Sequence, residues 1–168
     1  VTSIVRSIVG ALLVSAGLTT FNHLQAMYGT DGRIRVGQEL GALATPSGYK
    51  PSMAVTEAGG LPFYSDWTAL DTWGLNDAQI ARSGKLDAAR LDELIPDLVV
   101  SHAKFAPNDT ALASDTPWDK MTVTLDDWVR ANDYQLAACW GSEPTDLYYY
   151  WVNPDSPIAD EIASIVSA

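Results

Sequence analysis

Two short, uninterrupted apolar runs constrain the fold of this chain most strongly. They are SMAVTE at residues 52–57 and PDLVVSH at residues 96–102, and glycine or proline flanks both. Strands without polar alternation are typical of sheets that are covered on both faces. Between them, residues 76–95 have helical periodicity with a break at Gly84. This order predicts an α/β fold, with a small, mainly parallel sheet flanked by helices.

The remaining elements are expected to complete that domain. Pro46 ends one predicted helix, Thr124 is expected to cap another, and Asp155 or Ser156 a third, with Pro157 in its first turn. The stretch 103–120 is rich in Pro, Asp, Ser and Thr and is expected to be a long loop. The predicted helices are residues 35–44, 124–133 and 155–168, and a hairpin is predicted from strands 134–140 and 146–153.

The beginning of the chain is a second constraint, because residues 7–30 contain no Asp, Glu, Lys or Arg. A helix that continues to Tyr28 is long enough to cross a hydrocarbon core of roughly 30 Å. Arg6 before this stretch favours an extracytoplasmic position for the rest of the chain. We therefore expect a hydrophobic helix at residues 1–30, as a membrane span, anchor or assembly helix, and an extracytoplasmic α/β domain at 31–168. A buried core helix and a signal peptide remain alternatives.

The charge of the chain restricts its partners. With 21 acidic and 10 basic residues, the net charge of −11 repels phosphate backbones and argues against nucleic acid. Sixteen of the acids are aspartate, which is also consistent with adaptation to high salt. The single cysteine, Cys139, lies in an apolar run and is expected to be buried. His23 and His102 belong to no ligand-spaced cluster, so neither a metal nor another cofactor is predicted.

The candidate ligand site centres on the segment GGLPFYSDWTALDTWGLND at residues 59–77, which combines four aromatic residues with three aspartates. Ligands of open parallel sheets bind beyond the carboxyl ends of the strands. Glu57 and His102 end the two predicted strands, and the segment is expected to form turns and a strand around them. The predicted ligand-binding residues are Glu57, Tyr64, Asp66, Asp71 and His102.

Carboxylates beside an aromatic wall suit a sugar, because the acids accept hydrogen bonds from hydroxyl groups and the rings cover the apolar face. Acid–base catalysis needs two carboxylates at a defined separation with different pKa values, and the sequence identifies no such catalytic pair. Two structural alternatives stay open. Asp71 would instead bind backbone amides of the glycine-containing turns, and His102 would be an ordinary residue at the end of a strand.

Residues 33–102 resemble the C-terminal extracytoplasmic part of multi-spanning membrane glycosyltransferases of the GT-C class, the aminoarabinose, arabinofuranosyl and mannosyl transferases that use polyprenyl-phosphate sugars. The resemblance follows the order of the elements as well as their residues. The matching positions are Gly60, Leu61, Pro62, Phe63, Tyr64, Asp71, Gly74, Leu75, Asn76, Asp77, Ile80, Ala81, Arg82, Pro96 and Asp97.

The resemblance implies a non-catalytic domain, because the catalytic carboxylate of such enzymes lies in an upstream loop that has no counterpart here. It implies binding of a glycan or a polyprenyl-phosphate sugar at the extracytoplasmic face of the cell membrane, and an extracellular position is the alternative. Two alternatives stay open. One is a pilin-like filament subunit that contacts the membrane or other copies of the same chain through residues 4–28. The other is a membrane-anchored carbohydrate-active enzyme that uses Glu57 and His102.

Overall fold

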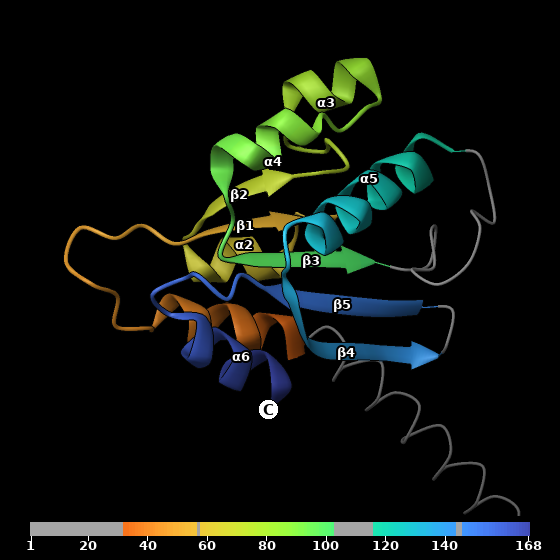
Figure 1. Ribbon diagram of the computed structural model, residues 1–168. Helices are drawn as coiled ribbons and strands as arrows, with labels where there is room; N and C mark the ends of the chain where they lie inside the picture. The colour runs from red at the N-terminus through yellow and green to blue at the C-terminus, as the bar shows by residue number, and fades with distance from the viewer. Residues whose placement is uncertain (1–31, 57, 103–115, 144–145) are drawn as a thin grey trace, which may run out of the picture. The chain divides into compact units, whose positions relative to one another are not determined.

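A mixed five-stranded sheet lies at the centre of the computed structural model, which describes residues 32–56, 58–102, 116–143 and 146–168 (Figure 1). Arg33–Ala168 forms one compact unit. The strand order is β2-β1-β3-β5-β4. The strands are β1 Ser52–Val55, β2 Thr68–Asp71, β3 Leu98–His102, β4 Gln135–Glu143 and β5 Asp146–Val152.

The α/β class is confirmed, but the prediction of a mainly parallel sheet is wrong. β1 pairs in parallel with β2 and with β3, whereas β5 pairs antiparallel with both β3 and β4. The physical reason is the length of the last connection. β4 and β5 follow each other too closely for a crossover, so they form a hairpin, and β5 folds back into the position beside β3.

Helices cover both faces of the sheet (Figure 1). A helix at residues 32–41, α2 (Gly60–Ser65) and α6 (Ala159–Ser167) cover one face. The other face carries α3 (Ala78–Ser83), α4 (Ala88–Leu94) and α5 (Pro117–Ala131). β1 and β3 are buried at every position, which explains their lack of polar alternation. The largest fully buried side chains include Leu40, Met53, Leu98 and Ile162 on the first face, and Ile80, Leu91, Val99 and Leu125 on the second.

Two of the predicted helix boundaries are wrong for reasons that lie in hydrogen bonding. α5 begins at Pro117, because Thr116 and Asp119 form a reciprocal capping box, and Thr124 lies inside the helix. α6 begins only at Ala159, and neither predicted cap serves it. The Ser156 hydroxyl donates to Asp97 over 2.7 Å and accepts the amide of Ile158 over 3.3 Å, and the residues just before Ala159 form a turn. The break at Gly84 is confirmed, with φ of 62° at the end of α3.

The segment at residues 59–77 contains more regular structure than its composition indicates. Residues Gly60–Ser65 form α2, with Pro62 in the first turn, where a missing amide hydrogen costs no helical bond. Asp66 ends this helix in the left-handed conformation, with φ of 56°. The strand expected in this segment is β2, which is a short edge strand beside β1.

Two glycines allow the helix at residues 32–41 to pack closely on α2. A Cβ atom at Gly37 would lie 2.9 Å from the carbonyl oxygen of Leu61, and one at Gly41 would lie 2.8 Å from that of Tyr64. Both obstacles are backbone atoms of α2, so they cannot move aside as a side chain end does. The two helices therefore depend on glycine at these positions rather than on side-chain interdigitation.

We expect Gly37→Ala to destabilise the domain by about 1–3 kcal/mol, as overpacking in a close contact does. This loss should appear although alanine is the better helix former by about 1 kcal/mol. Urea unfolding followed by circular dichroism measures the effect. Gln38→Ala, at the exposed neighbouring position, is the control and should change stability little. Equal stability of Gly37→Ala and wild type would contradict this packing.

The predicted hydrophobic helix at residues 1–30 and most of the predicted loop lie outside the described residues. Within the ranges that are described, no helix is both long and apolar enough to cross a membrane. Cys139 is exposed on β4, which corrects the expectation that it is buried. The reason is that β4 is the outermost strand and its side chains are only partly covered.

Candidate functional site

The carboxyl ends of β1, β2 and β3 lie at the same end of the sheet, because these three strands are parallel. We call this end, where the strands terminate, the carboxyl edge of the sheet. Hydrogen bonds tie the residues beyond the strands together. The Thr72 hydroxyl donates to the carbonyl of Val55 over 3.0 Å, and the His102 amide donates to the Thr56 hydroxyl over 3.1 Å. The threonines thus extend the pairing past the ends of the ladder and hold the edge together.

An aromatic row crosses this edge. The His102 imidazole stacks on the Tyr148 ring with centroids 4.2 Å apart and planes 5° apart. The Trp73 ring lies 5.9 Å from His102, and the Arg33 guanidinium lies 4.5 Å from the centroid of Tyr148. We call Arg33, Tyr148, His102 and Trp73 the aromatic row. Its members come from four different elements or turns, so the tertiary fold alone assembles it.

Burial and hydrogen bonding fix the row in place. His102 is 4% exposed, whereas Trp73, Tyr148 and Arg33 are half-buried and offer part of their surface to solvent. The Trp73 indole donates to the Thr122 hydroxyl of α5 over 2.9 Å, which holds the ring against the edge. A guanidinium above a phenol ring is a cation–π pair, whose attraction is worth about 0.5–2 kcal/mol. The row is therefore a partly exposed aromatic surface with a cation at one end.

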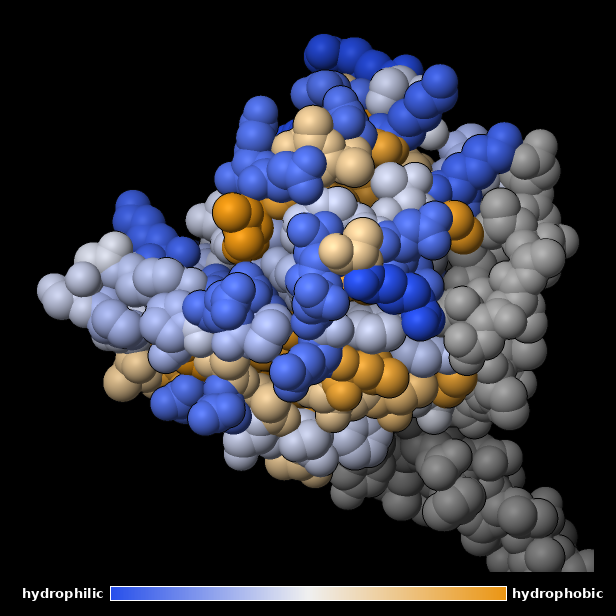
Figure 2. Space-filling model, in the orientation of Figure 1, coloured by the Kyte–Doolittle hydropathy of each residue, from blue (hydrophilic) through white to orange (hydrophobic). Residues whose placement is uncertain are grey.

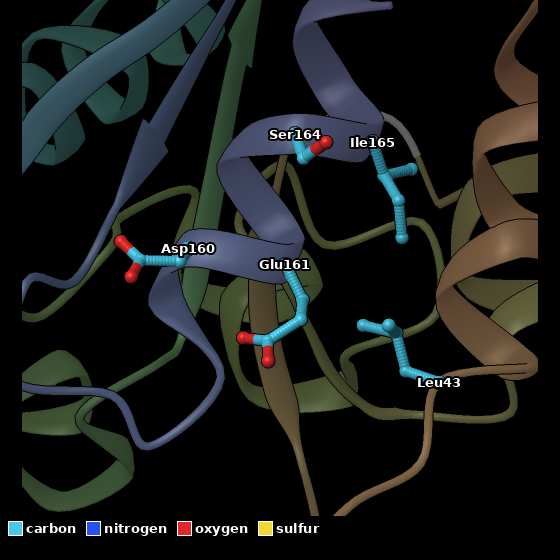
Figure 3. Close-up of a pocket in the computed structure, with 5 residues that line it drawn as sticks. All are labelled: Leu43, Asp160, Glu161, Ser164 and Ile165. Carbon is cyan, nitrogen blue, oxygen red and sulfur yellow. The ribbon is translucent and has the colours of Figure 1, made fainter.

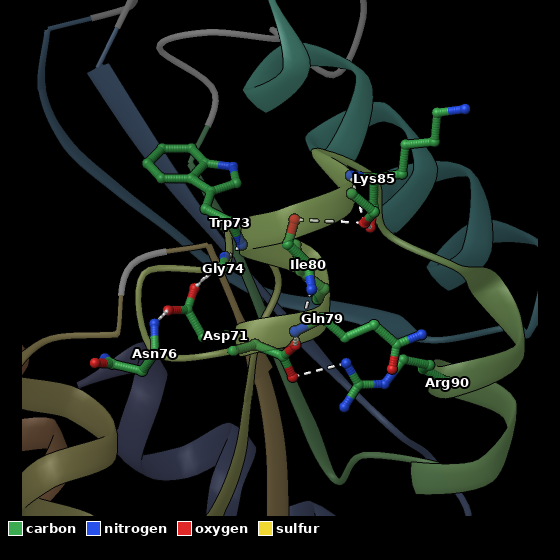
Figure 4. A network of polar contacts seen from close by, with 10 residues as sticks. Asp71, Trp73, Gly74, Asn76, Gln79, Ile80, Lys85 and Arg90 are labelled. Carbon is green, nitrogen blue, oxygen red and sulfur yellow. Dashed lines mark hydrogen bonds and ion pairs between the residues drawn. The ribbon is translucent and has the colours of Figure 1, made fainter.

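Asp71 organises the turn that carries Trp73 (Figure 4). One carboxylate oxygen accepts the amides of Trp73 and Gly74 at 3.1 and 3.0 Å, and the other accepts the amide of Asn76 at 2.6 Å. The side chain is 4% exposed, and Gly74 has φ of 80°, which favours glycine. These contacts are those of the structural alternative for Asp71, in which it binds backbone amides.

Asp77 caps α3 and forms an ion pair with Arg90. Asp77 accepts the amides of Gln79 and Ile80 at 3.0 Å each, and Arg90 of α4 contacts its second oxygen at 2.7 Å. Burial works against the charged form, but the Ile80 amide, Arg90 and the Gln79 amide outweigh it and lower the pKa of Asp77. The carboxylate therefore links the start of α3 to α4.

The predicted site residues do not all meet. Asp71 and His102 lie at the same edge of the sheet, where Trp73 connects them. Asp66 precedes the amino end of β2 and so lies at the opposite edge. Tyr64 is in α2, 41% exposed, and forms an edge-to-face pair with Phe63 at 5.1 Å. Glu57 lies outside the described residues.

Sequence reasoning missed three members of the aromatic row, Arg33, Trp73 and Tyr148. The run of aromatic residues at 148–151 was a signal for Tyr148, since alternate residues of a strand face the same side. Trp73 stands two residues after a predicted site residue. No sequence signal marks Arg33, because its contact with Tyr148 joins the start of the described domain to its fifth strand.

A separate hollow of about 380 Å³ lies between α6 and the chain that follows the helix at residues 32–41 (Figure 3). It is shallow and contains none of the predicted site residues. Its lining is Leu43, Asp160, Glu161, Ser164 and Ile165. In the part of the chain that the structure describes, no group of three or more His, Cys, Asp or Glu residues is arranged to hold a metal ion.

Comparison with known proteins places the chain in a family. The family model described as "Domain of unknown function (DUF8728)" matches residues 22–154. The chain belongs to this family. The matched range contains all five strands of the sheet and the whole aromatic row, and it ends before α6. Searches of curated proteins and of solved structures found no match.

Proposed function

We propose that this DUF8728 domain is a non-catalytic, extracytoplasmic recognition domain of the kind that follows the membrane spans of GT-C glycosyltransferases. It binds a glycan or a lipid-linked sugar at the carboxyl edge of the sheet. The observation that carries the proposal is the aromatic row, whose half-buried Trp73 and Tyr148 rings lie at the strand ends where α/β sheets bind ligands. Sugars bind such rings through the apolar faces of their C–H groups.

The contacts of Asp71 support recognition rather than catalysis. Its two oxygens already accept three backbone amides, so its role is to hold the turn below Trp73. The His102 ring stacks on Tyr148 and lies 5.9 Å from the tilted Trp73 ring, so it forms part of the aromatic surface. The proposal therefore assigns the domain contacts with a sugar but no chemical step.

We expect Tyr148→Ala to weaken sugar binding by about five- to tenfold, which corresponds to the loss of one aromatic contact of about 1 kcal/mol. A glycan array and polyprenyl-phosphate mannose in detergent micelles serve as probes, with affinity measured by calorimetry on the full chain. Leu136→Ala, an exposed residue on β4, is the control and should leave Kd unchanged.

A companion variant, Tyr64→Ala, tests whether the aromatic pair on α2 contributes. Absence of binding to every probe by the wild-type chain would contradict the proposed function. Binding that Tyr148→Ala leaves intact would move the ligand away from the aromatic row. Melting temperatures of all variants separate a lost contact from a lost fold.

A further inference from the structure

The Tyr148 ring of the aromatic row is covered on both of its faces. The His102 imidazole lies parallel to it, with the two planes 5° apart and the centroids 4.2 Å apart. The Arg33 guanidinium carbon lies 4.5 Å from the centroid of the same ring. An imidazole and a guanidinium cannot both lie over the centre of one ring face at these distances. The guanidinium therefore lies over the face that His102 leaves free.

The two groups that cover Tyr148 differ in how firmly the fold holds them. His102 is buried, pairs with Tyr148 in the ladder between β3 and β5, and donates its amide to the Thr56 hydroxyl. Arg33 is half-buried and reaches the ring from the helix at residues 32–41 through a long side chain with several rotatable bonds. The imidazole is therefore a fixed part of the sheet, whereas the guanidinium can move off the ring without any change in the strands.

Within the described residues, the open side of Tyr148 is the side of β4. Tyr148 pairs with His102 of β3 on one side and with Trp140 of β4 on the other. Since the imidazole takes the side toward β3, the guanidinium lies on the side toward β4. Trp140 is 48% exposed, and Figure 2 shows hydrophobic residues gathered over β4 on the face that it presents. A ligand that approaches Tyr148 from this side therefore meets the guanidinium of Arg33.

We propose that Arg33 is an autoinhibitory residue, which covers the face of Tyr148 that a sugar needs and which the sugar displaces when it binds. This inference rests on the proposed function, because it concerns the same ring. A guanidinium and the C–H groups of a sugar are both attracted to the negative face of an aromatic ring, so they compete for one surface. Binding sacrifices the cation–π pair, which lowers the apparent affinity about two- to thirtyfold.

The test compares the wild-type chain with Arg33→Ala on the neutral glycans of an array, and calorimetry on the full chain then measures Kd for the strongest binder. Neutral glycans exclude any attraction between the guanidinium and a negatively charged probe. We expect Kd to fall about two- to thirtyfold in Arg33→Ala. Arg35→Ala is the matched control, because it removes the same charge from an exposed position of the same helix, where Arg35 pairs with Glu39. It should leave Kd unchanged.

Two further measurements connect the effect to Tyr148. In the Tyr148→Ala background, Arg33→Ala should bring no gain in affinity. In the ligand-free wild type, the ring current of Tyr148 should shift the side-chain proton resonances of Arg33 upfield, and addition of the glycan should remove this shift.

Three results would each overturn the inference. They are an equal or higher Kd in Arg33→Ala, the same gain in Arg35→Ala, and the same gain in the Tyr148→Ala background. Binding of any probe by the wild-type chain would still support the proposed function in these cases. Absence of binding by both wild type and Arg33→Ala to every probe, polyprenyl-phosphate mannose included, would contradict the proposed function and this inference together. Melting temperatures show whether each variant is folded.

Discussion

Replacing Asp97 by alanine is expected to lower the free energy of unfolding by about 4 kcal/mol, since several hydrogen bonds to a buried charged group are lost together. Asp97 is 2% exposed. It accepts the amide of Ser52 and the hydroxyl of Ser156 at 2.7 Å each, and also the phenol of Tyr49. The variant leaves these donors without their acceptor inside the domain.

The effect should be large because the Asp97 side chain joins three separate parts of the chain. Ser52 begins β1, Tyr49 precedes it, and Ser156 lies in the turn before α6. The backbone of Asp97 adds bonds of 2.9 Å to Ser52 and 3.0 Å from Asn153. Burial and the adjacent carboxylate raise the pKa of Tyr49, which reinforces its phenol as a hydrogen donor to Asp97.

Urea unfolding of the purified chain measures this loss. Asp127→Ala, an exposed aspartate on α5, is the matched control and should stay within about 0.5 kcal/mol of wild type. Asp97→Asn, which retains one carbonyl acceptor but no charge, should fall between the two. A loss of less than about 1 kcal/mol for Asp97→Ala would show that the three donors find other partners.

Replacing Asp71 by alanine is expected to lower the free energy of unfolding by about 2–4 kcal/mol, because three amides of a tight turn lose a charged acceptor. The shortest of the three bonds, from the Asn76 amide, is 2.6 Å. The turn also carries Trp73, so the variant should loosen the aromatic row and weaken sugar binding together with stability. Thermal unfolding and calorimetric titration with the same probes measure both effects.

The Asp71 experiment also separates the two interpretations of this residue. Unchanged melting together with abolished binding would assign Asp71 to the ligand site and contradict its structural role. Asp71→Asn is the informative companion, because it keeps an acceptor for the amides of Trp73 and Gly74 but places an NH2 group against the Asn76 amide, so its stability should lie between those of wild type and Asp71→Ala. Asp66→Ala at the opposite edge of the sheet should leave binding unchanged.

Several positions that carry the resemblance to glycosyltransferases have structural roles in this fold. Asp71 and Gly74 shape one turn, Asp77 caps α3, and Asp97 joins three segments. The carbonyl of Pro96 accepts the phenol of Tyr134 over 2.5 Å. Residues with such roles say more about how this chain folds than about what it binds. Sugar binding therefore has to be tested at the aromatic row and cannot be inferred from these positions.

The sequence by itself determined the elements whose signals are local. Continuous apolar runs gave β1 and β3, and Gly84 marked the break between α3 and α4, because burial on both faces and a left-handed helix end each leave a pattern in neighbouring residues. The capping box at Thr116 and Asp119 is also a signal between neighbouring residues. The start of this helix was nevertheless predicted seven or eight residues too late.

Only the tertiary structure decided how distant segments meet. The antiparallel insertion of β5 beside β3, the bonds from Ser156 to Asp97 and the contact of Arg33 with Tyr148 join residues that are tens of positions apart. The aromatic row is a consequence of that arrangement. The physical basis is packing between whole elements. A pattern of neighbouring residues does not determine which elements will lie side by side.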